Sequence, residues 1–140
     1  MKRLIAALLV ILTLLTLCLP GCVSSNQSII VEEVNGYVKV TLDGFDGTEK
    51  IKIKKNNPGD ASLYYCAIIT EGGVTVHTDE GWLWPTRKFF TAVSGKEITN
   101  GMYVDSSTTE LTIIIKANQT ASGEIIFSLS GGPSPFESND

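Results

Sequence analysis

The sequence predicts an all-β fold, a single antiparallel β-sandwich of about seven to nine strands that follows an N-terminal signal helix. Apolar and polar residues alternate with a period of two in several short segments, which is the pattern of a half-buried strand. Glycine, proline, asparagine and aspartate separate these segments at fairly even spacing. After the N-terminal segment, no stretch has the period of an amphipathic helix.

The individual strands follow from this alternation. The clearest case is residues 36–43, where Val38, Val40 and Leu42 share one face. Residues Thr48–Lys54 alternate in the same way, with isoleucines on one face and lysines on the other, and lysines on an edge strand also prevent edge-to-edge pairing. The remaining strands are expected over residues Ser28–Val34, 62–70, 74–77, 88–93, 110–116 and 124–129.

The connections between the strands carry their own signals. Glu71-Gly72-Gly73 predicts a hairpin loop between the strands at 62–70 and 74–77. The polar stretch 99–108 is expected to be irregular, and residues 131–140, with their Gly, Pro, Ser and acids, predict a disordered tail. The sandwich domain is therefore expected to span residues 28–130.

The N-terminus carries an export signal. Lys2 and Arg3 precede an uncharged apolar run of about 16 residues, which as a helix of roughly 24 Å is short for a bilayer core of about 30 Å. The run ends in Leu19-Pro20-Gly21-Cys22, which resembles the lipobox of prokaryotic lipoproteins. The resemblance implies a signal peptide over residues 1–21, cleavage between Gly21 and Cys22, lipidation (palmitate) of Cys22, and a spacer over 22–27. The alternative is an uncleaved single transmembrane anchor.

Charge and cysteine content narrow the function. Loss of Lys2 and Arg3 with the signal moves the net charge from −4 to −6, and an acidic surface argues against nucleic-acid binding. Cleavage also removes Cys18 and lipidation uses Cys22, so Cys66 remains without a disulfide partner. Its apolar neighbours predict a small buried side chain and not a nucleophile.

Three landmarks carry a family resemblance. They are the turn Lys55-Asn56-Asn57-Pro58-Gly59-Asp60-Ala61, a tryptophan after the next strand (Trp82 or Trp84), and Ala121-Ser122-Gly123-Glu124-Ile125 before the last strand. Together they resemble the immunoglobulin-like sandwich domains of bacterial and archaeal surface proteins, including their cell-adhesion-related domain. The resemblance implies an immunoglobulin-like sandwich that serves as an adhesive, spacer or display module and has no active site.

The most suggestive binding feature is Trp82-Leu83-Trp84-Pro85. In an extended chain, Trp82 and Trp84 share one face, where two indoles can stack on a sugar ring or anchor a protein partner. Arg87 nearby adds a polar contact. The alternative interpretation places one tryptophan in the core.

Three further motifs are weaker. His77, Asp79 and Glu80 form a candidate metal or hydrolytic site, although a structural zinc normally needs four ligands and no nucleophile motif accompanies them. Asp43, Asp46 and Glu49 surround two glycines as in some calcium loops, without the spacing of an EF-hand. Asn26 and Asn118 begin N-glycosylation sequons.

These observations predict an extracytoplasmic lipoprotein at the cell surface that is a binding or structural module, not an enzyme, and needs no cofactor. Its expected partners are the membrane and a glycan or an envelope protein. The first alternative is an accessory subunit of a membrane complex. The second is a small metal-binding or hydrolytic lipoprotein centred on His77.

Overall fold

The computed structural model describes residues 28–55, 59, 61–79, 86–105, 107–131 and 134–136. The predicted signal peptide, Cys22, Asn26, Glu80 and both tryptophans lie outside this set. None of the described residues forms a helix long and apolar enough to span a membrane. The described residues form seven strands: β1 (Ser28–Val34), β2 (Tyr37–Phe45), β3 (Thr48–Lys54), β4 (Ala61–Asp79), β5 (Arg87–Val93), β6 (Glu97–Val104) and β7 (Glu110–Ser130).

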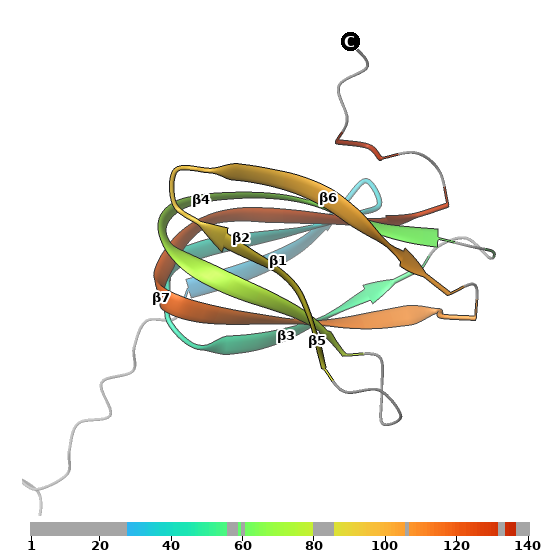
Figure 1. The fold of residues 1–140 in the computed structure, drawn as a ribbon, viewed down its shortest axis with the longest axis horizontal. Helices are drawn as coiled ribbons and strands as arrows, with labels where there is room; N and C mark the ends of the chain where they lie inside the picture. The colour runs from blue at the N-terminus through green and yellow to red at the C-terminus, as the bar shows by residue number, and fades with distance from the viewer. Residues whose placement is uncertain are drawn as a thin grey trace, which may run out of the picture.

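All strand pairs are antiparallel, which confirms the all-β antiparallel sandwich (Figure 1). Two long strands, β4 and β7, run through both layers. The first half of β4 and the second half of β7 pair with each other and with β6 and β2, and β1 adds to β2. We call this layer sheet I. The second half of β4 and the first half of β7 pair with β5 and β3, and we call this layer sheet II.

The strand order is that of a jelly roll. Sheet I has the order β1-β2-β7-β4-β6, and sheet II has the order β3-β7-β4-β5. The immunoglobulin order implied by the family resemblance differs, since each strand of that fold belongs to only one of its two sheets. The alternation of side chains is the same in both arrangements, so it predicted the sandwich but left the strand order open.

The ends of the sandwich differ. At one end β4 and β7 bend from sheet I into sheet II near Gly72 and Gly123, and β1 also begins there, because Ser28 pairs with Asp43 of β2 close to the bend. We call this the closed end. At the opposite, open end lie Asp79 at the end of β4, the start of β5, and residues 105 and 107–109 between β6 and β7.

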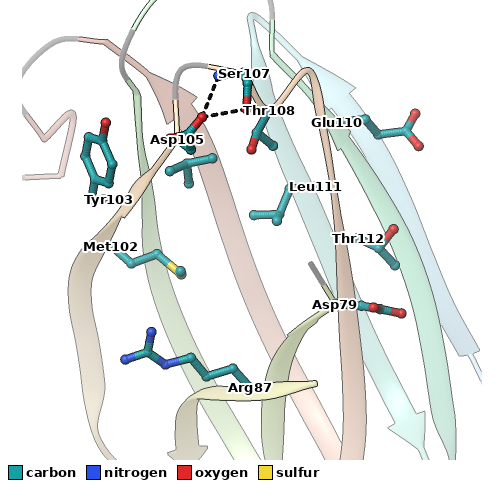
Figure 2. A pocket seen from close by; sticks show the side chains of 11 residues that line it. Asp79, Arg87, Met102, Tyr103, Asp105, Ser107, Thr108, Glu110, Leu111 and Thr112 are labelled. Carbon is teal, nitrogen blue, oxygen red and sulfur yellow. Dashed lines mark hydrogen bonds between the residues drawn. The ribbon is translucent and has the colours of Figure 1, made fainter. Parts of the chain in front are cut away.

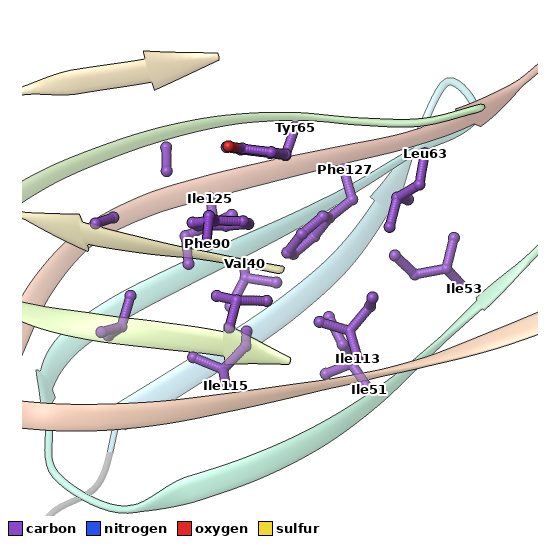
Figure 3. Close-up of a cluster of buried hydrophobic side chains, with 14 of the residues drawn as sticks. Val40, Ile51, Ile53, Leu63, Tyr65, Phe90, Ile113, Ile115, Ile125 and Phe127 are labelled. Atoms are coloured by element: carbon purple, nitrogen blue, oxygen red, sulfur yellow. The ribbon is translucent and has the colours of Figure 1, made fainter. Parts of the chain in front are cut away.

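The core lies between the two sheets (Figure 3). Val40, Leu63 and Phe127 enter it from sheet I, and Ile51 and Ile113 enter it from sheet II; each is almost fully buried. Burial of such apolar surface is the main stabilising term of the fold. Aromatic rings join the layers near the β5–β6 side, where the Tyr65 and Phe90 rings stack at a centroid distance of 3.9 Å.

Three predicted segments were wrong. The strands expected at 110–116 and 124–129 are not separate, because β7 is continuous from Glu110 to Ser130. Glu71-Gly72-Gly73 is not a hairpin loop, because β4 continues through it and pairs with β7 on both sides. The buried positions of β4 change from odd to even across the register shifts there, which keeps one face of the bent strand on the core. The stretch 99–108 is not wholly irregular, because residues up to Val104 belong to β6, which pairs with β4.

Part of the predicted tail lies against sheet I. The Phe136 ring is 6.1 Å from the Tyr37 ring of β2, and the backbone N–H of Phe136 donates to the Ser134 hydroxyl. Residues 132–133 and 137–140 lie outside the described part of the chain.

Candidate functional site

Two hollows lie where the two sheets separate at the open end and along the β5–β6 side. One cavity of about 720 Å³ lies at the open end (Figure 2), and a second of about 460 Å³ lies between β5 and β6. Arg87, Met102 and Tyr103 line both, so the two cavities adjoin, and we call them together the edge cleft. It exists because β5 and β6 are edge strands of different sheets and are not paired with each other.

The edge cleft combines an apolar floor with polar groups of both signs. Met102 and Leu111 supply apolar surface inside it. Arg87 supplies guanidinium donors and Asp105 supplies carboxylate acceptors. Tyr103 lies at its border with a side chain that is 63% exposed. An exposed aromatic face beside convergent donors and acceptors is typical of a ligand site, and mixed charges favour a neutral polar ligand over an ion.

Asp105 is held in place by the loop that follows β6. The Ser107 hydroxyl and the Ser107 backbone N–H both donate to its carboxylate, at 2.5 and 2.8 Å (Figure 2). These hydrogen bonds lower the pKa of Asp105, and the positive charge of Lys55 lowers it further. Asp105 is therefore a fixed, ionised acceptor in the cleft at neutral pH.

Of the predicted binding residues, Arg87 lies in the edge cleft. Trp82 and Trp84 lie outside the described residues, in the segment that joins Asp79 to Arg87, two residues that line the cleft. Asn118 is exposed on β7, and its side chain exchanges hydrogen bonds with the Thr75 hydroxyl at 2.9 and 3.1 Å.

The predicted metal ligands do not come together among the described residues. His77 pairs with Lys88 and Ile114 in sheet II, and its side chain alternates with the buried Val76 and Thr78. His77 therefore points to the outer face of sheet II. No group of three His, Cys, Asp or Glu side chains within the described ranges is placed to hold a metal ion, and this includes the predicted calcium loop.

Cys66 is half-buried on the outer face of sheet I, so the prediction of a core position was wrong. It alternates with the inward-facing Tyr65 and Ala67. Burial raises the pKa of the Cys66 thiol, and Glu97, whose carboxylate lies 3.6 Å from the sulfur, raises it further. The protonated thiol is a poor nucleophile.

Among the cleft residues that the sequence did not predict are Met102, Tyr103 and Asp105. They fall in the stretch that was expected to be irregular because of its polar residues and Gly101. The available signal was the alternation of Ile98, Met102 and Val104 on one face.

No protein-family model matches the chain, and no curated protein matches it. It is similar to solved structures of carbohydrate-binding modules. A mutant of the module CBM29-2 is 17% identical, with 77% of this chain and 84% of that chain covered and a TM-score of 0.42. A second family 29 mutant is 17% identical, with 72% and 73% covered and a TM-score of 0.40. A structure from family CBM4 is 13% identical, with 76% and 80% covered and a TM-score of 0.37.

Proposed function

We propose that the chain is a non-enzymatic binding module, fixed to the outer face of a membrane through Cys22, whose edge cleft takes a short segment of neutral glycan. The observation that supports this proposal most directly is that the start of β1 and the edge cleft lie at opposite ends of the sandwich. The chain enters β1 at the closed end, and the edge cleft opens at the other end. Sheet II alone separates the two ends by roughly 20 Å along β4.

The tether supports this orientation. Six residue steps join Cys22 to Ser28, so the closed end lies within about 20 Å of the lipid attachment point. A diacyl anchor has two chains, at about 0.8 kcal/mol per buried methylene, which is enough for stable attachment. A module anchored in this way presents the edge cleft away from its own membrane.

The lining supports a glycan as the ligand class. Sugar rings offer apolar C–H faces, which stack on exposed aromatic rings such as Tyr103. Their hydroxyl groups both donate and accept, which matches Arg87 as a donor and Asp105 as a fixed acceptor. His77 lies on the outer face of sheet II and Cys66 on the outer face of sheet I, which supports binding without catalysis.

Anchoring is tested by the intact mass of the protein isolated from its native membrane. The expected mass corresponds to residues 22–140 with a diacylglyceryl group on Cys22. Cys22→Ser is expected to abolish the lipid and the cleavage together. A mass equal to residues 1–140 without lipid would instead establish an uncleaved signal anchor.

Glycan binding is tested with the detergent-solubilised full chain on immobilised neutral glycans. Tyr103→Ala and Arg87→Gln are each expected to lower the affinity for the immobilised glycan by about 5- to 30-fold, as for central residues of other interfaces. Tyr37→Ala is the matched control, because Tyr37 lies on β2 away from the cleft. The same assay on Trp82→Ala and Trp84→Ala tests the two tryptophans.

Equal binding by Tyr103→Ala and the unchanged chain would remove the edge cleft as the site. Co-purification of a stoichiometric membrane protein, with no glycan retained, would favour the accessory-subunit alternative instead.

A further inference from the structure

The outer face of sheet II concentrates the positive charge of the chain. Nine basic residues follow Arg3, and five of them lie at outward positions of this sheet. We call this surface the lysine face, and its members are Lys50, Lys52, Lys54, Lys88 and Lys116. Among the described residues, the acids at outward positions of the same sheet are Asp79 and Glu110, although the whole chain has more acids than bases.

The strand pairing fixes this arrangement. Ile51 and Ile53 of β3 are buried, so Lys50, Lys52 and Lys54 point outward and follow one another at about 7 Å. Lys116 follows the buried Ile115 of β7 in the same alternation. Lys88 lies opposite the outward-facing His77 at the edge of sheet II, where it also lines the cavity between β5 and β6.

Most of this charge is uncompensated. Lys52 forms an ion pair with Glu110 at 2.7 Å, but Lys50, Lys54, Lys88 and Lys116 have no ion pair within the described part of the chain. Protection of an edge strand explains lysines on β3. It does not explain Lys116, because β7 lies between β3 and β4 in the interior of sheet II.

We infer that the lysine face binds a linear anionic polymer of the cell envelope, one that carries carboxylate or phosphate groups along its length. A row of flexible ammonium groups suits regularly spaced anions without demanding a fixed geometry, unlike the fork of an arginine. The face is the surface of an extended sheet, which matches an extended chain more closely than a small ion.

The direction of the row favours a polymer over lipid headgroups. Lys50, Lys52 and Lys54 run along β3 from the closed end toward the open end, since Thr48 pairs with Lys116 near the bend and Lys54 pairs with Glu110. With the chain tethered at the closed end, the row extends away from the bilayer. This choice between polymer and lipid rests on the proposed membrane anchoring. The charge complementarity between the lysine face and an anionic ligand is independent of the anchoring.

The test compares two charge-matched double variants of the full chain in neutral detergent: Lys50→Gln with Lys54→Gln, and Lys39→Gln with Lys96→Gln. Both remove two positive charges, but Lys39 belongs to sheet I and Lys96 to the β5–β6 turn. The probes are immobilised polygalacturonate, long-chain polyphosphate and, as a neutral reference, dextran. Vesicles of phosphatidylglycerol and phosphatidylcholine form a separate arm.

The expected result is binding of the unchanged chain to at least one polyanion and not to dextran. The face double variant loses roughly 25-fold in affinity, from about 5-fold per lysine. The slope of its log affinity against log salt concentration becomes less negative by about one to two. The control double variant changes by less than about 3-fold.

Equal losses in the two double variants would overturn the inference, because net charge alone would then account for the binding. Binding to vesicles without binding to either polymer would also overturn it and assign the face to the membrane. If the β3 variant aggregates, Lys116→Gln alone replaces it, with an expected loss of about 5-fold. Loss of lipid from Cys22 affects none of these polymer measurements. The anchoring proposal is therefore tested independently of the lysine face.

Discussion

Replacing Gly123 with alanine is expected to lower the free energy of unfolding by about 4 kcal/mol, from the combined costs of backbone strain and overpacking. Gly123 has a φ of 145°, a conformation that L-residues rarely adopt. A Cβ there would lie 2.3 Å from the carbonyl oxygen of Ile68 and 2.7 Å from the Cα of Ile69. Both are backbone atoms of β4, so no side-chain rotation relieves the overlap, and β4 and β7 would have to separate at the bend.

Denaturant unfolding of the full chain in detergent, followed by far-ultraviolet circular dichroism, measures this loss. Gly44→Ala is the matched control. Gly44 has a φ of 64°, but nothing lies within 4 Å of a Cβ placed there, so about 1 kcal/mol of strain is the whole expected cost. Gly72→Ala tests the same bend from β4, because its Cβ would lie 2.0 Å from the Thr120 carbonyl oxygen. Similar midpoints for Gly123→Ala and Gly44→Ala would show that the close approach is not essential.

The second large effect is expected for Phe127→Ala, at about 4 kcal/mol. The Phe127 side chain is fully buried on β7, and its ring lies 6.4 Å from the Phe90 ring of β5. Truncation removes a large apolar group and leaves a cavity between sheet I and sheet II, which the paired strands cannot close. A loss of this size is a large fraction of the usual stability of a domain.

The neighbouring residue provides the control for this truncation. Ile126 points to the outer face of sheet I and is only partly buried, so Ile126→Ala is expected to cost about 1 kcal/mol. Both variants are measured by the same denaturant titration. A smaller loss for Phe127→Ala than for Ile126→Ala would mean that sheet I presents its other face to the core.

The elements that could be predicted are those that depend on alternation. The isoleucines of β3, and Val40 and Leu42 of β2, are buried as their period of two indicated, and Val38 is partly buried. The stretch at 71–73 could not be assigned in this way, because a glycine pair serves equally well in a hairpin loop and in a bent strand. What decided between them is the pairing of β4 with β7, a contact between residues distant in sequence.

The edge cleft was predictable only in part. Arg87 was selected because it is a charged residue beside two tryptophans, and the structure places it in the cleft. Tyr103 and Asp105 carry no local signal of a site. They become cleft residues only because β6 forms the edge of sheet I on the side where β5 forms the edge of sheet II.

The sequence by itself determined that the chain is all-β, because which face of a strand is buried depends only on the period of its side chains. It also determined that the lysines of β3 share one side of the strand. Only the tertiary structure decided the jelly-roll order. It also decided that the start of β1 and the edge cleft lie at opposite ends, and that lysines from three strands form one face. These properties depend on which strands pair, and pairing depends on long-range backbone contacts such as the approach of Gly123 to Ile68, which local sequence patterns do not encode.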